Sequence, residues 1–345
     1  MPAGHPATSS DPPDPPGRTD RRPVVSAAVW RSADLTDPGE WMFELTEPER
    51  DELVEATRAA RATGVTTATV DRATFPLPTI GARVSAWSAQ LNTGRGFLLL
   101  RGFPIDRLDP ADTELAYVGF GTHLGTAVGQ DKDGTLLGHV RDEGVERTDP
   151  SIRFYRTRAR QDFHTDGADL VGLLCLHRAR SGGESRIASS AAVYNEMLRR
   201  RPDLVDVLYE PLAWDRNDEQ SPGEPPFFEL PAFTDLDGRP RVFYIGWYIR
   251  DAQRHPEAPR LRPEQLEAMA LLEAIANDPA VHLEMDFRPG DVQLLNNARI
   301  LHAREAYEDD DDPAERRHLL RLWLAAHHFT SVDDLLLGGI PTQQR

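Results

Sequence analysis

The sequence predicts a mainly β protein with added helices, built as a β-sandwich or jelly roll. From Asp162 onward, short apolar segments alternate with turns rich in Gly, Pro, Asp and Asn. This pattern is typical of sheets that close on themselves or pack face to face. Earlier in the chain, longer segments carry helix start and stop signals, which predict helices packed against the sheets.

Helices and one strand are expected in the N-terminal part of the chain. The helices are predicted at residues 46–64, 80–91 and 109–124. Thr46 and Glu49 form a capping-box pattern at the start of the first helix, and Asp109 opens the third. Residues 96–104 form a short apolar run bounded by glycines, which predicts a buried strand.

The C-terminal part is expected to hold most of the sheet. Helices are predicted at residues 190–201 and 263–276, and strands at residues 170–176, 242–249, 281–287, 292–295 and 319–326. The Gly-Gly turn at residues 181–185 is expected to lead into a further strand or edge. The helix at 263–276 is amphipathic, and Leu266 is expected on its apolar side. The segment 215–231 is charged, rich in proline and ends in Phe227 and Phe228. Because it is long for a structureless connection, we expect a lid-like insert near residues 213–231.

Composition narrows the class of protein. The chain has 345 residues and a net charge of −17 without a basic patch, so nucleic-acid binding is not expected. We expect no membrane span and no signal peptide, and therefore a cytoplasmic protein. Cys175 is the single cysteine and lies in an apolar run, so it is expected to be buried and inert. Residues 1–25 read as a disordered Pro-rich tail, which leaves residues 26–345 as one domain. A homo-oligomer is compatible with the sequence.

His164 and Asp166 are the strongest candidates for a metal site. In a strand, residues two apart point to the same face, so an imidazole and a carboxylate would meet at one point. His302, far downstream, is the expected third ligand. Two histidines and one carboxylate suit Fe(II) and leave positions open for a cosubstrate and O2. The His-x-Asp pattern alone is also common in surface turns.

Arg317 and Arg321 are candidates for binding an anion. In the alternating run 317–324 they share one strand face with Leu319 and Trp323. A guanidinium in apolar surroundings is costly unless it meets an anion, and its planar fork fits a carboxylate. Ser185, after a Gly-Gly turn, offers a hydroxyl that could support the same anion. The alternative is that both arginines are exposed to solvent.

Several motifs follow one another in a fixed order along the chain. They are His164-x-Asp166, Gly182-Gly183-x-Ser185, Pro289-Gly290-Asp291, Asn296-Asn297 before His302-x-Arg304, and Arg317-His318-Leu319-x-Arg321. Together they resemble the taurine dioxygenase/TfdA superfamily, which includes the clavaminate synthase-like enzymes. Residues 96–104 look like the family's early Gly-Phe strand, so the resemblance extends from about residue 94 to Trp323.

The resemblance implies a double-stranded β-helix core (a jelly roll, cupin-like) flanked by helices, in a single catalytic domain. It implies Fe(II) as cofactor, 2-oxoglutarate as cosubstrate and O2 as oxidant. His164, Asp166 and His302 would bind iron. Arg317 would clamp the 5-carboxylate of 2-oxoglutarate, with Ser185 where the family usually has Thr. Arg321 would face the anionic group of the prime substrate.

The function that the resemblance implies is oxidation of a small-molecule substrate, with succinate and CO2 as coproducts. We expect hydroxylation of an unactivated C–H in a small polar metabolite, anionic or amino-acid-like. Desaturation or cyclisation by the same cofactors is an alternative, whereas halogenation is disfavoured because Asp166 occupies the carboxylate position. A zinc hydrolase or a cupin-like metal-binding module is the alternative from another class, and it gives the arginine pair no role.

Overall fold

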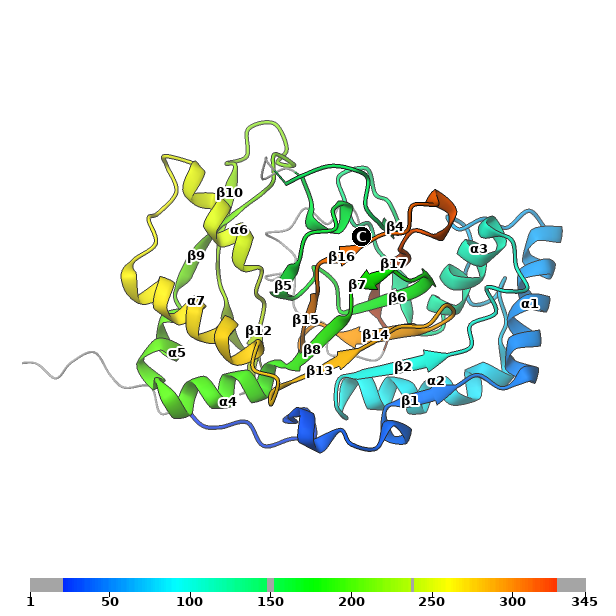
Figure 1. The fold of residues 1–345 in the computed structure, drawn as a ribbon, viewed down its shortest axis with the longest axis horizontal. Coiled ribbons are helices and arrows are strands. Elements are labelled where there is room, and N and C mark those ends of the chain that lie inside the picture. The colour runs from blue at the N-terminus through cyan, green and yellow to red at the C-terminus, as the bar shows by residue number, and fades with distance from the viewer. Residues whose placement is uncertain (1–20, 148–151, 237–238, 328–345) are drawn as a thin grey trace, which may run out of the picture.

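The computed structural model describes residues 21–147, 152–236 and 239–327, and its centre consists of two facing sheets (Figure 1). The larger sheet has the order β1 (Met42–Glu44), β2 (Phe97–Arg101), β14 (Val292–Asn296), β6 (Leu170–His177), β17 (His318–Ala326), β3 (Gly125–Ala127), and β4 (Leu137–Val140) also pairs with β17. The smaller sheet has the order β13 (His282–Met285), β8 (Ser185–Ser189), β15 (Ile300–Arg304), β5 (Gln161–His164). Only β1 and β2 pair in parallel in these sheets. The jelly-roll prediction is confirmed.

A buried apolar layer lies between the two sheets. The larger sheet contributes Phe97, Leu295 and Leu319, and the smaller sheet contributes Ile187, Met285 and Ile300. Alternation along β17 works as predicted, because Leu319 and Trp323 point into the barrel, whereas Leu320, Leu322 and Leu324 join the layer outside it.

The outer face of the larger sheet is covered by the three predicted N-terminal helices, α1 (Glu47–Ala62), α2 (Pro78–Asn92) and α3 (Pro110–Gly121) (Figure 1). The capping box forms as predicted, since the backbone N–H of Thr46 donates to Glu49 at 2.8 Å. The Asp109 carboxylate caps α3 by accepting from the backbone N–H of Asp112 at 2.8 Å. Local capping signals therefore set the starts of α1 and α3.

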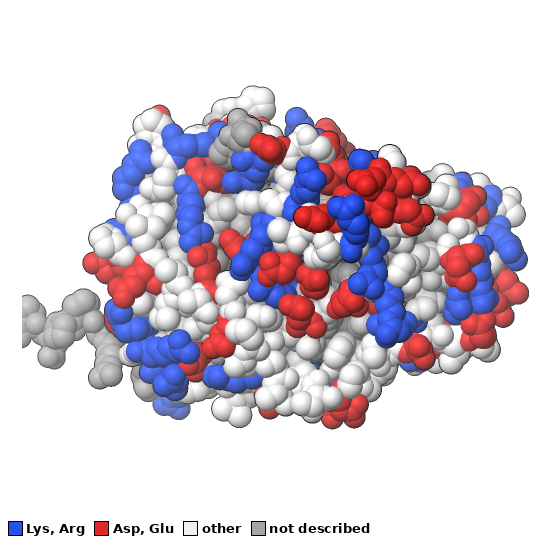
Figure 2. Space-filling model, in the orientation of Figure 1, with Lys and Arg blue, Asp and Glu red and all other residues white. Residues whose placement is uncertain are grey.

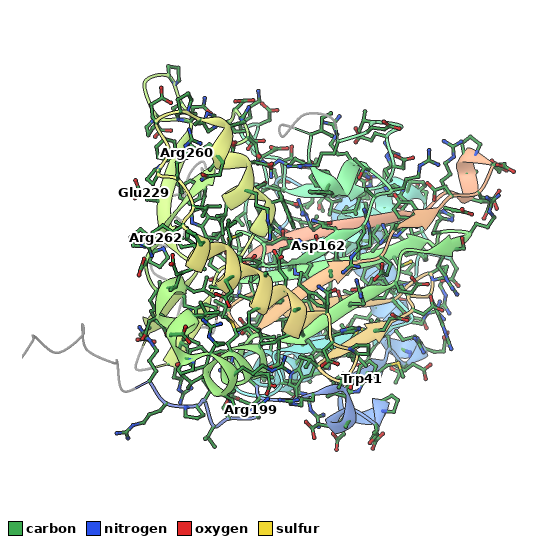
Figure 3. All side chains as sticks on the ribbon, turned by 60° about the vertical axis from the view of Figure 1, so that its left-hand side comes forward. Trp41, Asp162, Arg199, Glu229, Arg260 and Arg262 are labelled. Carbon is green, nitrogen blue, oxygen red and sulfur yellow. The ribbon has the colours of Figure 1, made fainter. Side chains whose placement is uncertain are left out.

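The smaller sheet is covered on its outer side by α4 (Ser190–Arg200), α5 (Pro202–Leu208) and α7 (Pro263–Ala276). Their charged side chains point outward, as Arg199 shows in Figure 3. Pro202 ends α4 as predicted, but it also begins α5, which was not predicted. A proline can do both because its missing N–H costs little in a first turn.

The predicted strand at 242–249 is wrong except at Val242. Strand β12 (Arg239–Val242), paired with β11 (Phe233–Leu236), ends at Val242, and α6 (Gly246–Asp251) follows. Most of the run is buried in the apolar cluster under α7. A continuous apolar run does not distinguish a strand from a buried helix, which explains the error.

Two further expectations are corrected. Leu266 is 47% exposed, because α7 buries the side that carries Met269, Leu272 and Ile275. The segment 215–231 is not structureless throughout, since β9 (Pro211–Asp215) and β10 (Phe227–Pro231) form an antiparallel hairpin. Only residues 216–226, called here the β9–β10 loop, connect the two strands without pairing.

Residues 1–20 of the expected tail lie outside the described residues. Residues 21–25 run beside α4, where the backbone N–H of Val24 donates to Asn195 Oδ1 at 2.7 Å. The remaining short strands are β7 (Ser181–Gly182) and β16 (Tyr307–Glu308), and short 3-10 helices occur at Ser32–Asp34, Pro38–Glu40, Phe154–Arg156, Ala252–Arg254 and Pro313–Glu315. In the described parts of the chain, no helix is long and apolar enough to cross a membrane.

The Pro289-Gly290-Asp291 turn joins three strands of the larger sheet. Gly290 has a φ of 85°, and a Cβ added there would lie 2.8 Å from the carbonyl oxygen of Phe103, so only glycine fits. The Asp291 carboxylate is fully buried and binds Arg101 with both oxygens, at 2.9 and 3.0 Å. The start of β14, and with it the path to His302, is fixed by these contacts.

Candidate metal centre and adjoining cavities

His164, Asp166 and His302 meet inside the barrel. His164 ends β5 and lies directly opposite His302 on β15, and Asp166 follows just beyond the end of β5. One potential ligand atom of each residue lies within 4.8 Å of the others, and all three side chains are buried. Among the described residues, this is the only such group of metal-ligating side chains.

Hydrogen bonds orient the members of this triad. His164 Nδ1–H donates to the carbonyl oxygen of Asp162 at 2.8 Å, which makes Nε2 the nitrogen with the lone pair. In this structure that Nε2 accepts from the Gln161 side-chain amide at 3.1 Å. The backbone N–H of Asp166 donates to Asn297 Oδ1 at 3.1 Å. The Asp166 carboxylate accepts from Trp323 Nε1 at 3.0 Å and from Arg321 Nη1 at 3.4 Å. Asn297, quoted in the sequence only as part of a motif, thus positions the candidate carboxylate ligand.

The ionisation states of the triad suit a divalent metal. Burial, with a contribution from His302, lowers the pKa of His164 to about 3, and burial also lowers the pKa of His302. For Asp166, burial acts to raise the pKa, but Arg321 and the two histidines outweigh it and hold the pKa at about 2. At neutral pH the group therefore presents two neutral imidazoles and a carboxylate, the deprotonated donors that Fe(II) needs.

A cavity beyond the triad contains the predicted anion-binding residues. Its lining includes Ser185, Arg317, Arg304 and Arg321 together with the triad. Arg317 and Arg321 are 4% and 7% exposed, so the alternative in which both face solvent is wrong. The Ser185 hydroxyl donates to Gln293 Oε1 at 3.2 Å, which holds it at the cavity wall.

Arg317 and Arg321 have different surroundings. Among the described residues, no acceptor pairs with Nη1 of Arg317, and burial lowers the pKa of this guanidinium. Arg321 donates from Nε to Gln130 Oε1 at 2.7 Å and packs between the rings of Tyr155 and Trp323. Of these two described arginines, Arg317 is the one that keeps an unpaired buried donor for an anion.

The Gly-Gly turn makes room for Arg317. Gly183 has a φ of 77°, and a Cβ there would lie 3.0 Å from Arg317 Nε. A side chain at this position would push against the guanidinium, and the backbone would be strained as well.

Arg304 is a candidate functional residue for which no role was predicted, although it belongs to the His302-x-Arg304 motif. It lies two residues after His302 on β15, is buried, and lines the same cavity as Arg317. Burial and the nearby Arg317 lower its pKa to about 10. The signal was present in the sequence, because strand residues two apart share a face.

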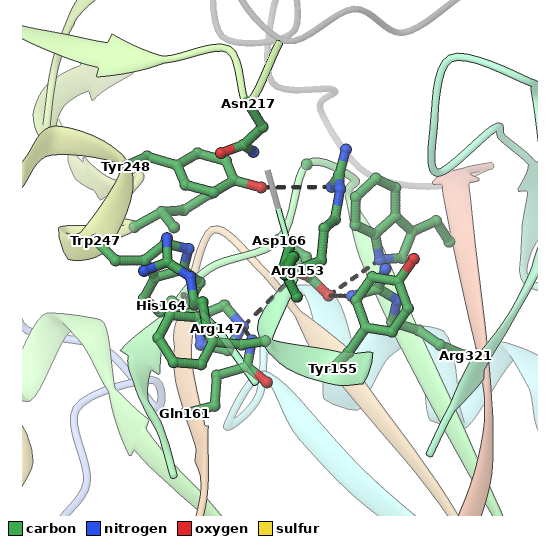
Figure 4. Close-up of a pocket in the computed structure, with 15 residues that line it drawn as sticks. Arg147, Arg153, Tyr155, Gln161, His164, Asp166, Asn217, Trp247, Tyr248 and Arg321 are labelled. Atoms are coloured by element: carbon green, nitrogen blue, oxygen red, sulfur yellow. Dashed lines mark hydrogen bonds and ion pairs between the residues drawn. The ribbon is translucent and has the colours of Figure 1, made fainter. Parts of the chain in front are cut away.

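A second cavity adjoins His164 and Asp166 (Figure 4). Its walls include Arg147, Arg153, Asn217, Trp247 and Tyr248, none of which was predicted. The Trp247 ring lies 4.8 Å from the His164 ring, centroid to centroid. Arg153 is paired with Glu219 of the β9–β10 loop and donates to the Tyr248 hydroxyl at 3.4 Å.

Two sheets around a triad of two histidines and a carboxylate, with a buried arginine in the cavity beyond, define a non-haem iron oxygenase that uses 2-oxoglutarate as cosubstrate. The family model described as "Taurine catabolism dioxygenase TauD, TfdA family" matches residues 57–323. The chain belongs to this family, and it is a 2-oxoglutarate-dependent dioxygenase with Fe(II) as its cofactor.

Relatives and solved structures agree with this assignment. FR-33289 synthase from Streptomyces rubellomurinus is 34% identical over 313 residues, covering 88% of this chain and 91% of the relative. The taurine hydroxylase-like protein SAT17 from Stachybotrys chartarum is 30% identical over 326 residues, covering 91% of this chain and 80% of the relative.

Two solved structures share the fold at low sequence identity. Asparagine oxygenase, in complex with Fe(II), 2S,3S-3-hydroxyasparagine and succinate, gives a TM-score of 0.63 at 17% identity and covers 82% of this chain and 93% of that one. The non-heme iron oxygenase OrfP, in complex with Fe and alpha-ketoglutaric acid, gives 0.60 at 16% identity and covers 82% and 94%.

Proposed function

We propose that this dioxygenase hydroxylates an unactivated C–H bond of a small anionic or amino-acid-like metabolite. The observation that carries the proposal is the cavity with Arg147, Arg153 and Tyr248, which reaches His164 and Asp166 and does not include Arg317 in its lining. The structurally similar asparagine oxygenase holds a hydroxylated amino acid, which supports both the reaction and the size of the substrate.

In this proposal each residue at the centre has a defined task. His164, Asp166 and His302 hold iron, Arg317 binds the 5-carboxylate of 2-oxoglutarate, and Ser185 supports the same carboxylate. Bound iron and 2-oxoglutarate supply O2 activation and the oxidising power, with succinate and CO2 as coproducts. Arg321 keeps the Asp166 carboxylate in place through a contact of 3.4 Å and faces the prime substrate from the wall that both cavities share.

The second cavity is suited to an anionic substrate. Arg147 and Arg153 both line this cavity. Arg147 forms an ion pair with Asp251 on α6. Arg153 forms one with Glu219 on the β9–β10 loop. A carboxylate or phosphorus oxyanion on the substrate presents the same acceptor geometry to a guanidinium. Trp247 and Tyr248 form an apolar wall that positions the substrate carbon skeleton and limits water near the reacting centre.

The β9–β10 loop is proposed to be the lid of this cavity. Asn217 lines the cavity, Glu219 pairs with Arg153, and Asp218 pairs with Arg254 at 2.7 Å. These contacts tie the loop over the opening, and we propose that it closes further when the prime substrate binds. We also propose that the enzyme acts in the cytoplasm, which fits its single buried and unpaired Cys175.

The test is O2-dependent release of succinate from 2-oxoglutarate, followed by a substrate screen read by mass. We expect stimulation by small anionic metabolites and a product heavier by one oxygen atom. Each anionic hit is paired with its neutral methyl ester or amide as a matched control. Equal stimulation by the neutral analogues would contradict the anionic substrate class, and a product lighter by two hydrogens would replace hydroxylation with desaturation or cyclisation.

A further inference from the structure

Two buried guanidiniums, those of Arg304 and Arg317, lie against the same aromatic ring. The guanidinium carbon of each arginine is 5.0 Å from the centroid of the Tyr307 ring. Both arginines line the cavity that also contains Ser185. Ser185 is the register partner of Arg304 on the neighbouring strand, so the hydroxyl and both guanidiniums lie at the same end of the barrel.

Arg304 has more N–H donors than its protein contacts use. Its Nη2 donates to the carbonyl oxygen of Thr157 at 3.0 Å and to that of Ala159. Among the described residues, no acceptor pairs with Nε or Nη1 of Arg304, or with Nη1 of Arg317. The three remaining buried donors belong to two residues that share one cavity.

Other buried arginines of the barrel do have carboxylate partners. Arg321 is beside Asp166, and Arg186 is paired with Glu305. Asp309 approaches Arg317, but its Oδ1 accepts from the Arg317 backbone N–H at 2.8 Å. Among the described residues, no carboxylate forms a direct ion pair with the guanidinium of Arg304 or Arg317, although Asp309 lies near both. A buried guanidinium without such a pair is unfavourable, so an anion in the cavity would stabilise both arginines.

We propose that Arg304 is a second binding residue for the 5-carboxylate of 2-oxoglutarate and forms, with Arg317, a clamp of two guanidiniums. The proposal rests on the proposed cosubstrate role of Arg317 and adds a residue to it. A carboxylate offers about four lone-pair sites, enough to accept from both guanidiniums and, once the Ser185 O–H turns away from Gln293 Oε1, from that hydroxyl as well. Arg304 thereby makes the enzyme selective for 2-oxo acids that carry a distal carboxylate.

Arg304 also has a structural task, and the test separates the two. Its bonds to Thr157 and Ala159 hold the segment that leads into β5 and therefore into His164. If this were the only role of Arg304, its removal would weaken the binding of every 2-oxo acid to the same degree. If Arg304 contacts the distal carboxylate, the loss is confined to ligands that have one.

The experiment measures dissociation constants by calorimetry on the anaerobic, Fe(II)-loaded enzyme with two ligands, 2-oxoglutarate and 2-oxopentanoate, which lacks the distal carboxylate. Arg304→Gln is expected to weaken 2-oxoglutarate at least about tenfold and 2-oxopentanoate less than about twofold. Arg304→Lys keeps the positive charge but loses the planar guanidinium fork, so it is expected to weaken 2-oxoglutarate binding severalfold. This variant provides the test if Arg304→Gln does not fold. Arg186→Gln, at a neighbouring buried position paired with Glu305, is the matched control and should leave both constants unchanged.

Unchanged 2-oxoglutarate affinity in Arg304→Gln, or equal weakening of both ligands, would overturn the clamp. If the wild-type enzyme itself does not bind 2-oxoglutarate, the proposed function fails. If Arg317→Lys weakens binding and the Arg304 variants do not, only the inference about Arg304 fails.

Discussion

Asp166 shows how much of the proposed chemistry depends on the surroundings of a single side chain. Its backbone is held by Asn297, and its carboxylate accepts from Trp323 and lies beside Arg321. These contacts favour the ionised form despite complete burial, as the pKa of about 2 indicates. A carboxylate that stays ionised and oriented in this way is ready to bind a metal.

We predict that His164→Ala, Asp166→Ala and His302→Ala each reduce Fe(II) retention and 2-oxoglutarate turnover by at least about a hundredfold. The reason is that loss of an outer contact to a metal ligand already costs about 10- to 100-fold, and loss of the ligand itself should cost more. Metal analysis after dialysis and succinate formation measure the two effects. His318→Ala, a change to a histidine bonded to His139 outside the triad, is the control. Near-normal metal content and turnover in any of the three triad variants would show that the replaced residue is not a metal ligand.

Arg317 and Arg321 should differ in kind when mutated. Arg317→Lys is expected to raise the KM for 2-oxoglutarate at least about tenfold, or ~1.4 kcal/mol, because Lys lacks the planar fork. Arg321→Ala is expected mainly to raise the KM for the prime substrate and to leave uncoupled 2-oxoglutarate decarboxylation running. Steady-state kinetics on both variants check this. Intact 2-oxoglutarate affinity in Arg317→Lys would remove Arg317 from the cosubstrate site.

At the scale of elements, the Pro289-Gly290-Asp291 turn connects the sheet to the site. It joins β14 to β2 through the ion pair between Asp291 and Arg101, and β14 leads by way of Asn297 to His302. Because Asp291 is fully buried whereas the Arg101 side chain is 18% exposed, the charge left behind by a mutation at 291 would keep some contact with water.

Asp291→Asn is therefore predicted to lower the free energy of unfolding by about 3 kcal/mol, the low end for breaking a buried ion pair. Urea unfolding followed by circular dichroism measures the change. Asp286→Asn, which breaks the solvent-exposed pair with Arg178, is the control and should change stability by no more than about 0.5 kcal/mol. A loss below about 1 kcal/mol in Asp291→Asn would show that the pair does not hold the turn.

The β9–β10 loop is predicted to exchange its backbone hydrogens more slowly when the prime substrate is bound. Its present ties, Glu219 to Arg153 and Asp218 to Arg254, are few, so the loop should open easily in the free enzyme. Hydrogen exchange read by mass spectrometry checks this, with α1 as the internal reference segment. Unchanged exchange over 216–226 on adding a turned-over substrate would contradict the lid.

The parts of the structure that were predictable are those with a regular sequence period or a local signal. Alternation along β17 placed Arg317 and Arg321 inside the barrel, and the Thr46–Glu49 capping box placed α1. Arg147 and Arg153 escaped prediction because they lie in irregular segments between β4 and β5, where no period indicates which way a side chain points. Their position depends on tertiary contacts with α6 and the β9–β10 loop.

At the scale of the molecule, two members of the triad belong to a wall shared by two cavities. Tyr155, Gln161 and Arg321 line both cavities together with His164 and Asp166. One cavity continues to Arg304 and Arg317, and the other to Arg147 and Arg153. In the proposed function, 2-oxoglutarate would occupy the first of these cavities and the prime substrate the second.

The molecule as a whole is negatively charged, whereas several arginines line the two cavities. Acidic side chains gather over the connection between β16 and β17 (Figure 2), which includes the exposed Asp311 and Asp312. The net charge of −17 therefore says little about the ligands, because the groups proposed to bind anions are arginines lining the two cavities. Surface charge of this kind mainly affects solubility and association kinetics.

The most direct test of the account is an anaerobic titration of the metal-free enzyme with Fe(II) and then 2-oxoglutarate, followed by visible absorption. For the wild-type enzyme, we predict a metal-to-ligand band that appears only after both additions and saturates at one equivalent of each. We predict that the band is absent in His164→Ala, Asp166→Ala and His302→Ala. Absence of the band in the wild-type enzyme, or its persistence in any triad variant, would contradict the assignment of this centre.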